Sequence, residues 1–230
     1  YNFKKFELNE NISTSGVGFN FKFGIIYRPA DWVRIGGALH SPSFYDMHDK
    51  WNNDMTTYFS SSLKPLEEKS PEGLFDYSLV TPMRAMGTIG FIIKKVGLLG
   101  IDYEFVDYSS AHLRASKYSY SKENRAIREK YGEAGNLRIG TEWRINFVSV
   151  RAGVAYYGIP FKNTAGNYGS HTNYTAGIGF REKLFFIDIA YILSQTKDRY
   201  YFYDPDVAQI DPSNNNSGST NVMITLGLRF

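Results

Sequence analysis

The sequence predicts an all-β fold: an antiparallel transmembrane β-barrel with about ten strands in this chain. Three observations support this prediction: segments in which apolar and polar side chains alternate, tight turns that alternate with long loops, and an aromatic content of 17%. We interpret residues 1–230 as a single domain. The strands are expected at 1–10, 15–28, 32–59, 75–94, 96–114, 135–145, 147–158, 172–182, 184–203 and 220–230.

The final segment, 221–230, shows the alternation most clearly. One face carries the apolar residues Val222, Ile224, Leu226, Leu228 and Phe230, and the other carries Asn221, Met223, Thr225, Gly227 and Arg229. The segments 18–28, 98–105, 136–144, 148–157 and 184–194 repeat this period of two, which is the period of a strand. One face of each strand therefore suits lipid and the other suits water.

The connections between these segments alternate in length. Tight links are expected at 29–31, 94–97, 145–147 and 181–183, and long ones at 60–73, 115–134, 158–172 and 203–219. Short turns on one side and long loops on the other are typical of outer-membrane barrels. An even number of strands would place both chain ends on the side of the tight turns. Within one long loop, 121–131 is expected to form a short charged helix capped by Ser121.

Composition excludes several classes of protein. The net charge of +3 is too small to indicate a nucleic-acid partner, and the lack of cysteine excludes disulfides and thiolate metal sites. No stretch has the roughly 18 apolar residues that a membrane helix needs. We find no nucleophile elbow, phosphate-binding loop or metalloprotease helix, so we expect neither an enzyme nor a cofactor. The start at Tyr1, without a signal peptide, indicates a mature or fragmentary product.

Four tracts of the sequence resemble a known family. They are FKFGIIYRPADWVRIGGALHSPSFYDM at 21–47, LVTPMRAMGTIGFIIKKVGLLGIDYEFVDYSSA at 79–111, NLRIGTEWRINFVSVRAGVAYYGIPF at 136–161 and NVMITLGLRF at 221–230. In order and spacing they resemble the long-chain fatty acid transporter family of outer-membrane proteins, the FadL and TodX type, in its Bacteroidetes branch. The resemblance implies a monomeric fourteen-stranded barrel with an N-terminal plug and a lateral opening, of which this chain is the C-terminal part.

Charged residues on the polar faces are the first candidate site. We expect an ion-pair network lining a wet lumen, made of Asp102, Glu104, Glu142, Arg144 and Asp188 together with neighbouring arginines. The alternative is a head-group site, because an arginine guanidinium pairs a carboxylate with two hydrogen bonds. If a fatty-acid carboxylate is bound, the candidates are Arg34, Arg84, Arg138 and Arg151.

A second candidate site lies toward the outer end of the segment 32–59. An outer apolar groove for greasy ligands is expected from Phe44, Tyr45, Met47, Trp51, Met55 and Phe59, and the alternative is an aromatic girdle at the membrane surface. The four histidines (His40, His48, His112 and His171) are scattered without ligand spacing, although relatives in the Bacteroidetes branch are sometimes labelled hemin receptors. Asp204, Asp206 and Asp211 match no calcium loop, so no metal site is expected.

We therefore expect an outer-membrane protein that moves long-chain fatty acids or other small hydrophobic compounds by passive diffusion through a gated barrel. The alternatives are a structural or adhesive barrel, or part of a larger envelope complex, without transport, and a hemin-binding receptor. Expected partners are the bilayer and its lipopolysaccharide, a hydrophobic substrate and the barrel assembly machinery, which recognises the terminal Phe230.

Overall fold

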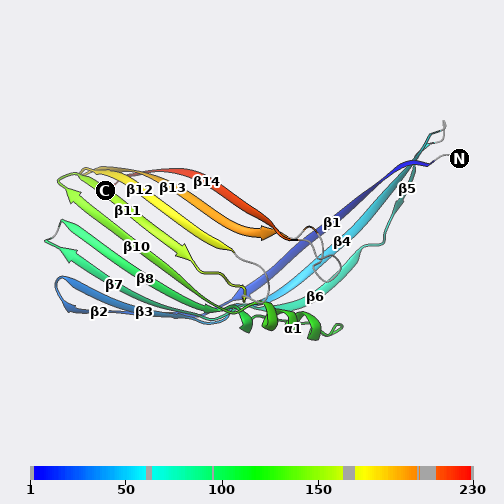
Figure 1. The fold of residues 1–230 in the computed structure, drawn as a ribbon, viewed down its shortest axis with the longest axis horizontal. Helices are drawn as coiled ribbons and strands as arrows, with labels where there is room; N and C mark the ends of the chain where they lie inside the picture. Colours follow the sequence, from blue (N-terminus) through cyan, green and yellow to red (C-terminus); the bar gives the residue numbers. More distant parts are fainter. Residues whose placement is uncertain are drawn as a thin grey trace.

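The computed structural model describes residues 3–60, 64–94, 96–162, 169–200, 202 and 211–228. Two antiparallel sheets make up most of this part of the chain (Figure 1), which confirms the predicted all-β class. The larger sheet has nine strands in the order β14-β13-β12-β11-β10-β8-β7-β3-β2. Their bounds are β2 Lys22–Ala30, β3 Val33–His40, β7 Arg84–Ile93, β8 Gly97–Asp107, β10 Glu133–Ile145, β11 Val148–Tyr157, β12 Ser170–Arg181, β13 Phe185–Tyr200 and β14 Ser213–Leu228.

The smaller sheet continues four of these strands, and three of the continuations run well beyond the larger sheet (Figure 1). It has the order β1-β4-β6-β9, with β5 also paired to β4. The bounds are β1 Phe3–Phe19, β4 Phe44–Phe59, β5 Leu66–Lys69, β6 Gly73–Val80 and β9 His112–Arg114. A strand rises about 3.3 Å per residue, so β1 alone is roughly 53 Å long. β1 is thus the longest strand in the described residues.

Four passes of the chain are interrupted where the two sheets meet. β1 leads into β2, β3 into β4, β6 into β7 and β8 into β9. Pro42 and Pro82 lie in two of these interruptions, and proline cannot donate a ladder hydrogen bond. The Ser41 amide still donates to the Phe21 carbonyl at 2.8 Å, and the Thr81 amide donates to the Ser43 carbonyl at 3.0 Å. The passes therefore stay bonded to one another across the break.

The chain makes nine passes in the described residues, not ten. The expected turn at 11–14 was wrong, because β1 runs without interruption through these residues and Asn11 to Thr14 pair in register with β4. The turn expected there had no glycine or proline to form it. With an odd number of passes, Phe3 and Leu228 lie at opposite ends of the strands (Figure 1), which corrects the expectation that both chain ends share the side of the tight turns.

The four tight connections are confirmed, and two of them use a left-handed residue, Lys94 with φ 46° and Asn146 with φ 54°. The long connections fall at the opposite ends of the strands, and 60–73, which joins β4 to β6 of the smaller sheet, contains the strand β5. Three expected loops were too long, because 133–134 belongs to β10, 170–172 to β12 and 213–219 to β14. Residues 115–132 contain the helix α1, Ser121–Lys130, but the residue at its N-cap is Tyr120 and its side chain makes no capping hydrogen bond. None of the described helices is long and apolar enough to span a membrane.

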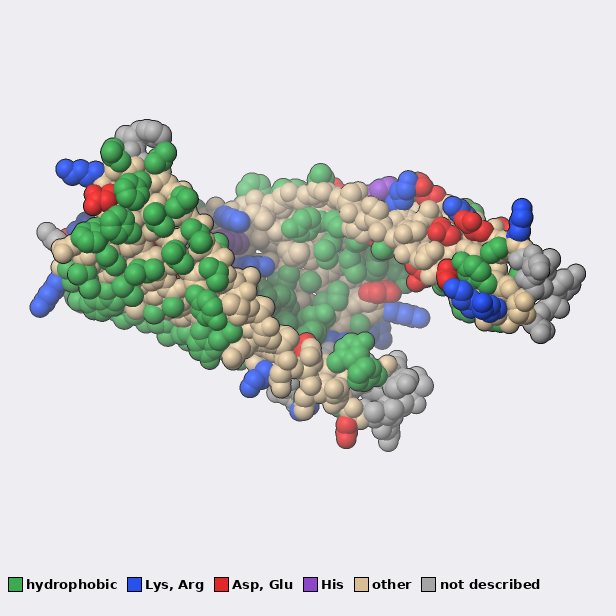
Figure 2. Space-filling model, turned by 90° about the horizontal axis from the view of Figure 1, so that it is seen from above, with side chains coloured by type: hydrophobic (Ala, Val, Ile, Leu, Met, Phe, Trp, Pro, Cys, Tyr) green, Lys and Arg blue, Asp and Glu red, His purple; other side chains and the backbone are tan. Residues whose placement is uncertain are grey.

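The burial pattern of the larger sheet is the reverse of that in a soluble sheet. Its polar face, which carries Asp102, Arg138 and Arg151, also holds the buried polar residues Glu104, Asn136 and Ser149, which are 5%, 6% and 3% exposed. Its apolar face is open: Ile224 is 66% and Leu226 72% exposed. Figure 2 shows hydrophobic side chains massed over the left part of the molecule and charged ones gathered on the extension at the right.

Candidate functional site

The first ion-pair cluster of the polar face lies toward the tight turns. It centres on Arg151 of β11, whose Nε donates to Glu142 of β10 and whose Nη1 donates to Asp188 of β13, each at 2.6 Å. Arg144 donates to the same Glu142 at 2.5 Å, and Arg181 lies 3.7 Å from Asp188. Because strand register sets these side chains next to one another, the cluster links four neighbouring strands.

The second cluster lies toward the long loops and centres on Glu104 of β8. Asn136 donates to this carboxylate at 2.6 Å, and the Arg138 guanidinium lies 3.6 Å from it. Arg84 is at 4.0 Å, the limit of an ion pair. Asp102 is opposite Arg138 in register but makes no ion pair with any described residue. The two clusters thus account for all of the expected network residues except Asp102.

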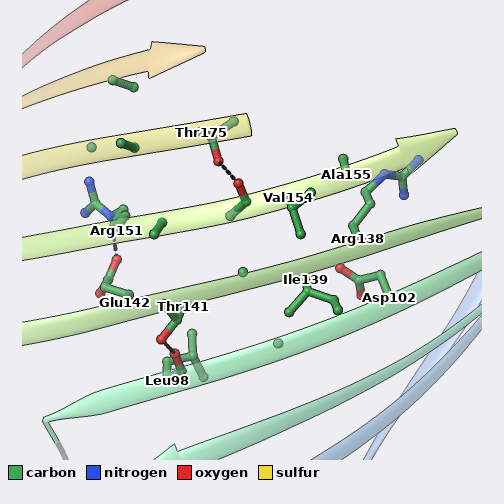
Figure 3. Close-up of a pocket in the computed structure, with 17 residues that line it drawn as sticks. Leu98, Asp102, Arg138, Ile139, Thr141, Glu142, Arg151, Val154, Ala155 and Thr175 are labelled. Atoms are coloured by element: carbon green, nitrogen blue, oxygen red, sulfur yellow. Dashed lines mark hydrogen bonds and ion pairs between the residues drawn. The ribbon is translucent and has the colours of Figure 1, made fainter. Parts of the chain in front are cut away.

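A groove of about 480 Å³ crosses the polar face between the clusters (Figure 3). Its floor includes glycines that are directly paired on adjacent strands, Gly100 of β8, Gly140 of β10 and Gly153 of β11. Its ends are marked by Asp102 and Arg138 on one side and by Glu142 and Arg151 on the other. On β8, which forms one border, every lining residue belongs to the polar face, so the groove opens on that face.

Two groups of described glycines differ in their surroundings, and Gly153 of the groove floor belongs to neither, because a Cβ there would meet the Thr175 hydroxyl at 2.8 Å. Some lie under the aromatic side chain of a cross-strand neighbour: a Cβ on Gly97 would come within 2.8 Å of the Trp143 ring, and one on Gly73 would strike Trp51. By contrast, a Cβ on Gly100 or Gly140 would meet nothing closer than 3.9 Å. The first group permits close packing of aromatic rings, whereas the second leaves open space above the sheet.

The four arginines predicted for a head-group site do not converge. Arg138 and Arg151 line the groove. Arg34, at the tight-turn end of β3, donates to the carbonyls of Ala30, Asp31 and Val33 at 3.0, 3.3 and 2.8 Å. Arg84 lies at the opposite end of its strand and is half exposed. The geometry therefore leaves Arg138 and Arg151 as the pair that one ligand in the groove could reach.

The residues predicted for the outer groove are strung along β4. Tyr45 and Phe59 are 14 residues apart, roughly 46 Å along an extended strand. The alternation of the strand sets Phe44, which stacks on Phe19 at 5.4 Å, on the face opposite Tyr45, Met47, Trp51, Met55 and Phe59. The six predicted residues therefore lie along one strand and do not form one compact site. Their role in binding stays a prediction.

The same part of the extension carries an aromatic cluster that was not expected. Tyr118 and Tyr120, from the loop before α1, pack on Phe75 and Tyr77 of β6 with ring centroids 6.3–6.4 Å apart. Burial and the nearby carboxylate of Asp49 raise the pKa of Tyr77. Contacts between a loop and a distant strand have no local sequence signal, which is why pattern analysis missed them.

The remaining candidates do not form a site in the described residues. His48 pairs with Asp76 at 2.5 Å and His171 with Thr196 at 2.8 Å, on different sheets. In the described ranges, no group of three or more His, Cys, Asp or Glu is arranged to hold a metal. Phe230, Asp204 and Asp206 lie outside the described residues.

Comparisons with known proteins give one structural likeness to report. The crystal structure of a Pseudomonas aeruginosa FadL homologue aligns over 94% of this chain and 67% of that chain, with 10% sequence identity and a TM-score of 0.44. No family model matches the sequence, and no curated protein matches it.

Proposed function

We propose that this chain forms part of the wall of an outer-membrane transporter that passes long-chain fatty acids or other small hydrophobic compounds by passive diffusion. The observation that carries the proposal is the reversed burial of the larger sheet, with an exposed apolar face and an ion-paired polar face. Exposed apolar surface of this extent is costly in water but favourable against lipid tails. An antiparallel sheet that is apolar outside and polar inside is the pattern of a transmembrane barrel.

The dimensions of the apolar face support a membrane position. On β13 it runs from Phe185 to Leu193, about 26 Å at 3.3 Å per residue, close to the apolar band of roughly 25 Å in known barrels. Aromatic rings gather at its tight-turn edge, where Trp32 stacks on Phe91 at 6.3 Å and Phe180 lies 5.1 Å from Phe147. Such rings anchor barrels at the membrane surface.

Closure of the barrel is part of the proposal. Among the described residues the outer edges of β14 and β2 have no partner strand. In lipid, each unpaired backbone N–H or C=O group has a free-energy cost on the order of several kcal/mol, because hydrocarbon offers it no hydrogen-bond partner. Both edges therefore need partner strands, and we propose that further strands supply them. A fourteen-stranded barrel with this chain as its C-terminal part meets that requirement.

In the proposed arrangement, the groove on the polar face holds the substrate. An alkyl chain lies over the glycine floor, and its carboxylate pairs with Arg138. Arg138 is the better candidate because its ion pair with Glu104 is longer, 3.6 Å, than the two 2.6 Å contacts of Arg151. A substrate carboxylate therefore displaces less from Arg138.

Displacement of a fluorescent fatty acid from the purified full-length protein tests this function. Saturable displacement that weakens about tenfold in Arg138→Ala, the effect of about 1.4 kcal/mol, supports the proposal. Arg34→Ala is the matched control, because that guanidinium is held by turn carbonyls outside the groove. Absence of displacement in the unmodified protein refutes fatty-acid transport.

A structural or adhesive barrel without transport is the second candidate. It is favoured by the two ion-pair clusters, because Glu142, Asp188 and Glu104 already hold the arginines of the polar face. The same titration separates the two functions, since a purely structural barrel binds no fatty acid.

A further inference from the structure

A polar hollow of about 380 Å³ lies at the loop end of β13 and β14. Lys197 and Arg199 of β13 line it together with Asn214 and Asn216 of β14 and Ser170 of β12. β14, the edge strand, contributes only these two asparagines, and the intervening Asn215 is absent from the lining. Because side chains alternate along a strand, the hollow opens on the same face as Val222 and Ile224, which is the apolar face.

The hollow lies on the same face of β13 as the apolar side chains that end at Leu193, and it is closer to the long loops. Along this face of β13 the side chains read Ile189, Tyr191, Leu193, Gln195, Lys197 and Arg199. The step from Leu193 to Lys197 is four residues, roughly 13 Å. Lys197 therefore lies roughly 13 Å beyond the last apolar side chain on this face of β13, and Asn216 lies six residues, roughly 20 Å, from Val222 on β14.

We infer that this hollow binds the phosphorylated headgroup of a membrane lipid, whose acyl chains lie along the apolar face below it. The combination of cationic hollow and adjoining apolar surface matches an amphiphile, not a free anion alone. The Lys197 ammonium suits phosphate oxygens, the Arg199 guanidinium adds a second positive charge, and the Asn214 and Asn216 amides can add neutral donors.

The charge balance of the hollow favours an anion. Asp198 is the acidic residue among those that line it, and its position between Lys197 and Arg199 assigns its side chain to the opposite face of the sheet. The inference rests on the membrane position in the proposed function, but it does not depend on transport.

Native mass spectrometry of the full-length protein in detergent tests the site with short-chain phosphatidic acid as the probe. We expect a retained lipid adduct in the unmodified protein and at least about a tenfold loss of it in Lys197→Gln/Arg199→Gln, because each charge-assisted contact contributes about 1.5–3 kcal/mol, equivalent to tenfold or more. Lys183→Gln, an exposed lysine at the tight-turn end, is the matched control and keeps the adduct.

Two further arms identify the ligand class. Diacylglycerol with the same chains lacks the phosphate and is expected not to be retained, whereas equal retention refutes headgroup recognition. Inorganic phosphate that binds as tightly as the lipid refutes the lipid and leaves an anion site. Lys197→Arg keeps the positive charge and is expected to keep the lipid adduct. Loss of the adduct in Lys197→Arg, or an unchanged adduct in Lys197→Gln/Arg199→Gln, overturns the inference. Failure of fatty-acid displacement with the phosphatidic acid adduct intact would refute transport alone.

Discussion

Arg151→Ala is expected to destabilise the sheet by about 2 kcal/mol. Arg151 bridges Glu142 and Asp188 at 2.6 Å each, and the three side chains are 30%, 17% and 19% exposed. Breaking a fully buried pair costs about 3–5 kcal/mol and an exposed pair about 0–1 kcal/mol. The intermediate exposure of this bridge sets the expected cost between these limits, because the substitution leaves two carboxylates without their shared cation.

Arg144→Ala is the matched comparison, since Arg144 also donates to Glu142 but its side chain is 59% exposed. We expect it to cost less than about 1 kcal/mol. The assay is urea unfolding of the full-length protein in detergent, followed by the loss of the folded band in unheated gel electrophoresis. Equal costs for the two variants, or no cost for Arg151→Ala, would refute the reasoning from burial.

The other predictions concern the groove, the extension and α1. Gly140→Val is expected to weaken fatty-acid displacement without loss of stability, whereas Gly97→Val strikes the ring of Trp143 and lowers the urea midpoint; a stability loss in Gly140→Val contradicts the open floor. Since the folded pKa of Tyr77 is raised above about 10, the extension is expected to lose stability as pH rises past 10 and through that raised pKa. Tyr77→Phe is expected to remove one of the components that ionise above about pH 10 in a tyrosinate absorbance titration, and an unchanged titration contradicts the raised pKa. Asn124→Ala removes two hydrogen bonds to the Leu113 backbone, at 2.8 and 2.9 Å, and is expected to speed proteolysis in residues 115–130; an unchanged rate contradicts the docking of α1.

The sequence predicts the strands well wherever one face is uniformly apolar. The segments 136–144 and 148–157 each fall within an observed strand, and 184–194 does so except for Leu184, because a continuous apolar face requires strict alternation. The polar stretch 7–15 in β1 lacks such a face. Where a strand has no continuous apolar face, nothing requires apolar and polar residues to alternate. A strand and a turn therefore look alike in the sequence of such a segment.

The candidate site is predicted only in part, because register is a property of paired strands. The charged residues were identifiable from the polar faces, but their grouping into two clusters depends on which positions lie opposite each other. Arg181 and Asn136 were missed for that reason. The paired glycines Gly100, Gly140 and Gly153 also come from separate strands, and only the register makes them one floor.

The central claim is that the apolar face of the larger sheet contacts lipid and the polar face contacts water. The most direct test uses single cysteines at Ile189 and Ala190, neighbours on β13 with opposite faces, in a chain that has no native cysteine. Spin labels are attached in bilayers, and their collisions with oxygen and with a water-soluble nickel complex are measured. We predict that the label at 189 collides mainly with oxygen and the label at 190 mainly with nickel; similar exposure of both labels, or the reverse order, would contradict the account.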